Sequence, residues 1–477
     1  MTALTGTAPT TPAAAPGGAQ ATTGIQPVPP DQRRLSAFDL GVLWGDLGVG
    51  LLVLQAGALL VPGLGATEAL GATLVGSLIG VLLLAIAAYV AADAGVPTMV
   101  LTRAALGLRG SALPTVLNVV QLLGWTSFEI LVMAQFADAI VSRLFGVSAY
   151  PFWAFVFAVF CTALALGGPL VVVRQWLEKF GVWAMLATTV ALVGLLVARG
   201  DLGSVLAMPG TGDLGFWLGV DIVVSLPVSW FPLIADYNRF ARSRSASFWG
   251  TFVGYFLANV SFFGLGLLFV LALHTDVAHL NDALVGFLGG SALLGLVALI
   301  IILADETDEG FANIYSTAVS TQNLLARVPQ RALVIAYGVI GFLLAVLLRN
   351  ADYEWFLLLI GSFFVPLLGL VAADYFVVRG RRYDGAALFV RDGRYWYQGG
   401  VNLLAVAAWL LGALLYLAIA PPASLSGLGD ALGAVLGAAG LPFPLPSPIG
   451  ATIPSFALTF ALHAVAGRAA AGRRDRP

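Results

Sequence analysis

The sequence has 477 residues, of which 59% are hydrophobic and 10% are charged, and its formal net charge is −2. A mean hydropathy of +0.94 excludes a soluble globular domain and predicts a polytopic membrane protein. We expect its location to be the inner (cytoplasmic) membrane. The single cysteine, Cys161, excludes a disulfide framework, and His274, His279 and His463 are too far apart in the sequence to suggest a metal-binding cluster.

Residues 1–34 begin with a stretch rich in Ala, Thr, Gly and Pro that has neither a basic start nor an apolar core. We therefore expect a disordered cytoplasmic tail and not a signal peptide. Residues 35–467 are expected to form the membrane domain, and residues 468–477 a second cytoplasmic tail.

Twelve apolar segments of the membrane domain are long enough, at about 20 residues each, to cross a bilayer as helices. Their approximate spans are 40–61, 69–92, 113–138, 150–168, 179–198, 214–235, 249–273, 287–320, 332–348, 354–378, 399–420 and 447–467. The predicted fold class is an all-α membrane protein with 12 transmembrane helices. We divide it into a first repeat (about 40–198), a second repeat (about 214–378) and two further helices (about 399–467).

The basic residues support this count. If the N-terminus is cytoplasmic, all Lys and Arg except Arg143, Arg199 and Arg349 fall on the cytoplasmic side, as the positive-inside rule requires. None is then left inside a span, so an acid in the membrane must be protonated or matched by a cation. The acids concerned are Asp46, Glu129, Asp221, Asp305, Glu306, Asp308 and Glu309.

The first and sixth segments look interrupted. The first has Gly41, Gly45, Gly48 and Gly50 around Asp46, and the sixth reads SLPVSWFPLIADYNRF, with two prolines. Pro removes a helix donor and Gly lowers the cost of unwinding, so both segments are expected to break. Broken helices five segments apart are typical of inverted-repeat transporters, although Gly and Pro are also common in ordinary membrane helices.

The third segment has a polar face. Asn118, Gln121, Trp125 and Glu129 follow one another at spacings of three or four residues and therefore share one side of a helix. One interpretation is a polar seam packed between helices. The other is a binding site, because an indole face next to a carboxylate suits a flat heterocycle that forms hydrogen bonds at its edge.

The eighth segment contains LADETDEGFANIYS, with four acids in five residues. On a helix, Ala304, Thr307 and Asp308 share a face whose hard oxygen ligands suit a small cation, and Glu306, Glu309 and Asn313 lie on a neighbouring face. If the helix began at residue 283, the acids would lie in cytoplasmic water. A start near residue 291 places them in the inner half of the bilayer.

Several motifs resemble the nucleobase:cation symporter-1 family, the purine/cytosine permeases, over about residues 35–467. They are GVPTMVLTRAALGLRG, the GW of the third segment, ADYNRFAR, FANIYSTAVSTQNL and VPLLGLVAADYFVVRGRRYD. The resemblance implies a leucine-transporter-type 5+5 inverted repeat with two extra C-terminal helices. The SWFPLIADYNRF stretch is most similar to cytosine and hydroxymethylpyrimidine permeases.

The resemblance also implies a stacking tryptophan, polar residues that contact substrate, and a sodium site. The expected substrate-binding residues are Gln121, Trp125, Glu129, Ser229, Trp230, Glu309 and Asn313. The expected cation site consists of Ala304, Thr307 and Asp308 with backbone near Gly48 and Gly50.

Three positions depart from the family pattern, and each adds a carboxylate: Glu129, Asp308 and Glu309. These departures leave Na⁺ and H⁺ open as coupling ion, and we expect no other cofactor. A carboxyl group can accept from an exocyclic amine, so we favour an amino-substituted base over uracil or a hydantoin.

The expected function is import of a nucleobase or related pyrimidine by Na⁺ or H⁺ symport. The alternative is an amino-acid/cation symporter of the same fold; a channel fits broken helices less well. We expect no enzyme, since the sequence suggests neither a His/Cys metal cluster nor a Ser/His/Asp triad. The expected partners are the lipid bilayer and a small-molecule nucleobase, with no nucleic acid and no obligate protein partner.

Overall fold

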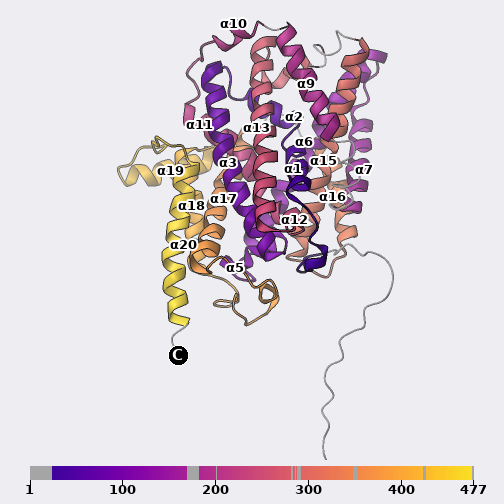
Figure 1. Cartoon of the computed structure of the whole chain (residues 1–477). Coiled ribbons are helices and arrows are strands. Elements are labelled where there is room, and N and C mark those ends of the chain that lie inside the picture. The colour runs from indigo at the N-terminus through magenta and orange to yellow at the C-terminus, as the bar shows by residue number, and fades with distance from the viewer. Residues whose placement is uncertain are drawn as a thin grey trace, which may run out of the picture.

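Long helices running side by side make up the molecule (Figure 1). The computed structural model describes residues 24–168, 182–199, 201–280, 283–284, 286, 292–347, 353–422 and 426–474. All regular elements within these ranges are helical. Seven of the described helices are long and apolar enough to cross a membrane, and a bent pair would make an eighth. The predicted number of twelve therefore stays a prediction.

The helices follow the predicted segments, with adjusted ends. The long ones are α3 (Ala66–Ala94), α6 (Ala112–Phe145), α7 (Tyr150–Gly167), α9 (Val182–Arg199), α13 (Arg244–Leu273), α15 (Ala292–Gln322), α16 (Gln330–Leu347), α17 (Tyr353–Ala373), α18 (Leu403–Ile419) and α20 (Thr452–Arg474). The shorter ones are η1 (Pro30–Gln32), α1 (Ala37–Asp46), α2 (Leu51–Ala58), α4 (Thr98–Leu101), α5 (Arg103–Leu106), α10 (Leu202–Leu206), α11 (Phe216–Ser229), η3 (Phe231–Leu233), α12 (Ile234–Asn238), η4 (Val277–His279), η6 (Asp374–Val378), η7 (Ala387–Phe389) and α19 (Ser426–Ala438). Sequence reasoning did not anticipate α19.

Both predicted helix breaks are confirmed. Helices α1 and α2 meet at an angle of 61° across a break of four residues that includes Gly48 and Gly50. In the sixth segment, α11 ends at Ser229, and the 3₁₀ turn η3, which contains Pro232, separates it from α12. The missing amide hydrogen of Pro232 makes a continuous α-helical ladder impossible at this point.

The helices pack in groups whose order repeats along the chain. Helix α13 packs against α1, α2 and α3, and α3 also packs against α11. In a second group, α6, α7, α15 and α16 pack against one another. A third group consists of α17, α18 and α20. The first group combines segments one, two, six and seven, and the second combines three, four, eight and nine, so equivalent segments of the two repeats lie together.

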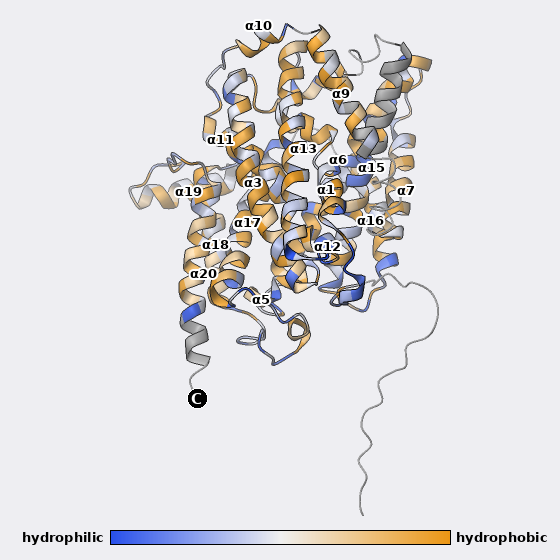
Figure 2. Ribbon diagram, viewed as in Figure 1, coloured by the Kyte–Doolittle hydropathy of each residue, from blue (hydrophilic) through white to orange (hydrophobic). Residues whose placement is uncertain are grey.

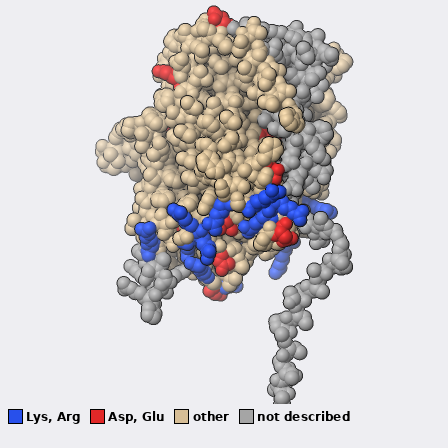
Figure 3. All heavy atoms as spheres, viewed as in Figure 1, with Lys and Arg blue, Asp and Glu red and all other residues tan. Residues whose placement is uncertain are grey.

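The outer surface is apolar, and the charges gather near one end. Helix α3 exposes Leu74, Leu78 and Leu82 along a single stripe, as expected for a lipid-facing helix. Figure 2 shows apolar residues along the outer helices. On the face shown in Figure 3, Lys and Arg form a band near the end of the molecule that carries α5 and the C-terminal end of α20.

The segment Gly24–Arg34 is folded onto the protein, which corrects the predicted tail at its C-terminal end. Val28 is buried and donates its amide hydrogen to the Gly95 carbonyl at 2.8 Å. Gly24 accepts a hydrogen bond from Arg239 at 3.0 Å and donates one to Gln330 at 3.1 Å. The polar composition of this stretch gave no sign of these contacts, most of which join a side chain of Arg33, Arg239 or Gln330 to a backbone group. Residues 1–23 lie outside the described part.

Candidate functional site

The predicted polar face of α6 is buried. Asn118, Gln121, Trp125 and Glu129 are all at most 6% exposed. The Gln121 side-chain amide donates to the Ser229 carbonyl at 3.1 Å and to Asn118 at 3.0 Å. Asn118 and Gln121 thus form the packed polar seam of the first interpretation, whereas neither carboxylate oxygen of Glu129 has a hydrogen-bond partner among the described residues.

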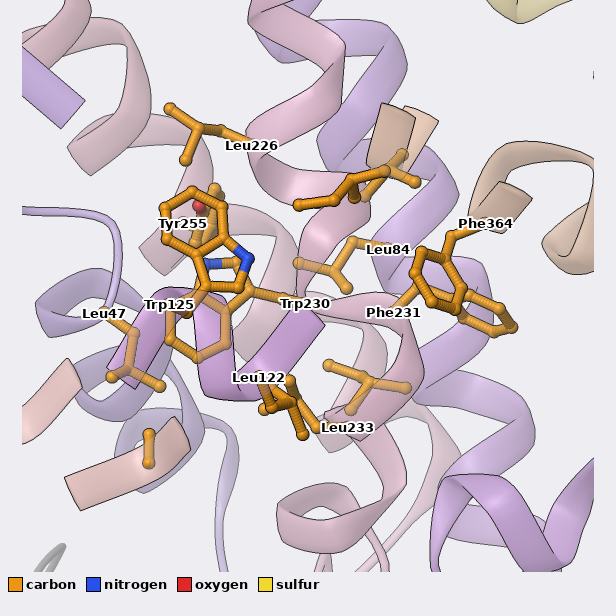
Figure 4. Packing of buried hydrophobic residues seen from close by; sticks show 14 of the residues in the cluster. Leu47, Leu84, Leu122, Trp125, Leu226, Trp230, Phe231, Leu233, Tyr255 and Phe364 are labelled. Atoms are coloured by element: carbon orange, nitrogen blue, oxygen red, sulfur yellow. The ribbon is translucent and has the colours of Figure 1, made fainter. Parts of the chain in front are cut away.

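A small pocket lies where the two broken helices face α6 and α15. Its lining residues are Leu47, Leu52, Val53, Trp125, Glu129, Leu226, Ser229, Trp230, Leu233, Glu309 and Asn313. Only about 10 Å³ is open to the centre of a water molecule, so the pocket is closed in this conformation. Figure 4 shows the rings of Trp125 and Trp230 gathered among Leu47, Leu226 and Leu233.

The structure brings together six of the seven residues expected to bind substrate. Trp125, Glu129, Ser229, Trp230, Glu309 and Asn313 all line this pocket. The seventh, Gln121, lies one hydrogen bond away through Ser229. Neighbouring aromatic rings fix both tryptophans, since Trp125 packs edge-on against Phe356 and Trp230 against Trp44. The substrate-binding role of these residues stays a prediction.

The residues predicted to hold a cation lie on α15 and at the break between α1 and α2. Thr307 and Asp308 are buried in α15, and the side chain of Ala304 lies outside the described part. Asp308 is close enough to Cys161 on α7 to interact with it electrostatically. On the broken first helix, Gly48 packs against α13, whereas a Cβ atom at Gly50 would lie 2.9 Å from Oε1 of both Glu306 and Glu309.

Three carboxylates meet beside the break between α1 and α2. Glu129, Glu306 and Glu309 are buried, and each places one oxygen within 4.8 Å of the others. Glu306 also accepts a hydrogen bond from the Leu51 amide, at the first turn of α2. The sequence predicted buried acids here, but it gave Glu306 no role, because its spacing alone does not show which helix it faces.

Two other buried carboxylates have donors of their own. Asp221 on α11 accepts from the amides of Ala451 at 2.6 Å and Thr452 at 3.0 Å, where α20 begins. Asp374 accepts from the Tyr383 hydroxyl at 2.9 Å, and its other oxygen lies 3.1 Å from Nε2 of His463. Each of these two carboxylates connects elements that are far apart in the sequence.

Comparison with known proteins identifies the family. The family described as "Permease for cytosine/purines, uracil, thiamine, allantoin" matches residues 27–436. The chain belongs to this permease family. The permease is 26% identical over 378 residues to the cytosine permease of Escherichia coli (strain K12), covering 73% of this chain and 83% of the relative. It is 24% identical over 396 residues to the hydantoin permease of Microbacterium maritypicum, and this match covers 79% of this chain and 80% of the relative.

Solved structures confirm the predicted fold class for this permease. Mhp1, a nucleobase-cation-symport-1 family transporter, in a closed conformation with bromovinylhydantoin bound, superimposes with a TM-score of 0.78 at 22% identity over 95% of this chain and 96% of that one. A Na⁺-coupled sialic acid symporter superimposes with a TM-score of 0.62 at 12% identity, over 93% of this chain and 91% of that one. At these identities the likeness shows the fold alone, and the fold is the inverted-repeat transporter architecture.

Proposed function

We propose that this permease is a secondary active transporter that imports a nucleobase or related pyrimidine together with a cation. The observation that carries the proposal is the pocket at the two helix breaks, where two tryptophans and the polar groups of Glu129, Glu309 and Asn313 line one closed space. Aromatic faces suit a flat ring, and polar groups at the rim suit its hydrogen-bonding edge.

The polar lining favours an amino-substituted base such as cytosine, a purine or a hydroxymethylpyrimidine. Ionised Glu129 and Glu309 accept hydrogen bonds only, and Asn313 both donates and accepts. The exocyclic amine of such a base donates to these acceptors, whereas uracil carries a carbonyl oxygen in place of the amine and would meet a carboxylate there. The E. coli cytosine permease, whose name describes such a substrate, is among the relatives.

The proposed mechanism is alternating access. A cation, Na⁺ or H⁺, binds near Thr307, Asp308 and the broken first helix and offsets part of the negative charge. The two helix groups then move relative to each other around the bound base. We place the end with the arginine band (Figure 3) and both described chain ends in the cytoplasm, and the protein in the inner membrane.

The amino-acid alternative is disfavoured by the N-terminus of α2. A carboxylate substrate in this fold needs a half-helix N-terminus whose amide hydrogens are available. Here the Leu51 amide already donates to Glu306. A substrate carboxylate would also approach Glu129 and Glu309, and like charges in a dry site repel strongly.

Uptake into proteoliposomes tests the proposal. Labelled cytosine should enter in a saturable manner under an inward Na⁺ or proton gradient. Unlabelled adenine or hydroxymethylpyrimidine should compete better than uracil, hydantoin or leucine. Leucine competing as well as cytosine, or uptake that does not saturate, would contradict the proposal.

A further inference from the structure

The three carboxylates beside the pocket have a geometry that transport of a neutral base does not explain. We propose that Glu129, Glu306 and Glu309 together form a binding site for one divalent metal cation. The site adjoins the predicted cation site on α15 and the first helix break but uses neither the Thr307 nor the Asp308 side chain. The inference does not depend on which substrate is carried.

The number and position of unpaired oxygens point to a cation. Both oxygens of Glu129, Oε2 of Glu306 and Oε1 of Glu309 accept no hydrogen bond from an amide, hydroxyl or basic group among the described residues, and the three carboxyl groups contact one another. All three side chains are at most 5% exposed. Glu129 comes from α6 and the other two from α15, so the cluster is assembled by helix packing and does not merely follow from neighbouring positions in the sequence.

The spacing matches the coordination sphere of a single ion. Each residue places an oxygen within 4.8 Å of the others. Calcium binds oxygen at about 2.3–2.6 Å, so two ligands on opposite sides of the ion can be about 5 Å apart. One ion can therefore touch all three carboxylates, and water on the pocket side can complete its shell.

The charge of the surroundings favours a divalent ion. Three ionised carboxylates leave a net charge of about −2 around Na⁺ and about −1 around a divalent ion, and uncompensated charge is costly in a low-dielectric interior. Acidic or neutral groups surround the cluster in the described part of the chain: Asp46 on α1, Cys161 on α7, Tyr255 on α13 and Asp308 on α15. None of them supplies a positive charge.

A bound ion would also affect the pocket. Glu129 and Glu309 belong to the carboxylate cluster and to the pocket lining. An ion that holds these two side chains in place fixes the acceptors offered to a ligand, so binding of ion and base would be thermodynamically linked. This last step rests on the proposed function; the ion site itself does not.

Ion binding is tested on the purified full chain after removal of metals with a chelator. Addition of Ca²⁺ or Mn²⁺ should raise the thermal unfolding temperature, and an equal concentration of Na⁺ should raise it less. Electron paramagnetic resonance should detect one tightly bound Mn²⁺ per chain. Failure of every divalent ion to bind or stabilise the wild type, or an equal effect of Na⁺, would overturn the proposal even if cytosine transport is found.

The variant Glu306→Gln tests whether Glu306 binds the metal ion or only packs between helices. It keeps the size of the side chain and removes one charge, so Mn²⁺ affinity should fall about tenfold or more. Its unfolding temperature without metal should equal or exceed that of the wild type, because repulsion is reduced. The matched control is Asp276→Asn on the exposed loop after α13, which should leave Mn²⁺ binding unchanged. Equal Mn²⁺ affinity in Glu306→Gln and wild type would refute the site, and the wild-type measurements decide the question if that variant does not fold.

Discussion

The carboxylate cluster and the Asp374 site are both buried, but they differ in what surrounds the negative charge. Asp374 lies where α17 passes into η6, with Tyr383, His463 and Arg379 at 2.9, 3.1 and 3.7 Å. Glu129, Glu306 and Glu309 face one another, and Glu306 also accepts from the backbone amide of Leu51.

This difference separates a carboxylate whose charge is compensated by the protein's own groups from carboxylates that, in our proposal, bind a cation. Around Asp374 the chain supplies Arg379 and Tyr383 from the segment after η6 and His463 from α20, and these contacts hold α20 to the rest of the molecule. At the carboxylate cluster, the donor found among the described residues is the Leu51 amide. Substitutions at the two sites should therefore act on different quantities, stability in the first case and ligand binding in the second.

The largest effect is expected for Asp374→Ala. Removal of the shared acceptor leaves the Tyr383 hydroxyl and the His463 ring nitrogen without this partner and Arg379 without its ion pair, which should lower the free energy of unfolding by about 3–5 kcal/mol. Thermal unfolding of the purified protein should show it, with the exposed Asp276→Ala as control. Uptake per folded molecule should stay close to wild type. If this variant unfolds at the wild-type temperature, the claim that Asp374 stabilises the fold is wrong.

Glu129→Gln should show the opposite pattern. Loss of a charged acceptor in the pocket should reduce cytosine uptake about 10- to 100-fold, the equivalent of about 1.5–3 kcal/mol. The unfolding temperature should not fall, because the change relieves repulsion within the cluster. Destabilisation as strong as that of Asp374→Ala would show that the two sites are alike and would break the comparison.

Trp125→Ala sharpens the comparison by removing the apolar wall of the pocket while all carboxylates stay. Loss of ring stacking should weaken cytosine uptake about three- to tenfold, from about 0.5–1.5 kcal/mol. Trp183→Ala on α9 is the matched control, since this ring is 66% exposed. A similar loss in both variants would indicate a general effect on the protein and not on the pocket.

Gly50→Ala is expected to have the smallest effect. The new Cβ atom would press on the carboxylates of Glu306 and Glu309, which are flexible side-chain ends and can move. Uptake or cation affinity should change only a few-fold, with unchanged stability. Gly194→Ala on α9, where a Cβ atom meets nothing within 4 Å, is the control. A large loss of stability would mean that the carboxylates are rigidly held.

Sequence reasoning was strongest where local chemistry decides the structure. The glycines around Asp46 and the prolines near Ser229 predicted both helix breaks, and the spacing from Asn118 to Glu129 predicted one buried face. The structure also buries Glu306, Asp308 and Glu309 within α15.

The rest depends on contacts between distant segments, which no local pattern encodes. Glu306 meets Glu129 only because α15 packs against α6, and it reaches Leu51 only because the first helix breaks there. Asp374 and His463 are 89 positions apart, so isolated histidines in the sequence gave no hint of the pair. The folded segment at Gly24–Arg34 has the composition of a tail and is held by carbonyl groups that every residue possesses.

That N-terminal segment connects the first and second groups of packed helices. Gly24 takes a hydrogen bond from Arg239 beside α12 and gives one to Gln330 at the start of α16. Separation of these helices at the arginine-rich end must break at least one of the two bonds. Each is worth only about 1 kcal/mol in net terms, so the segment would resist such a separation only weakly.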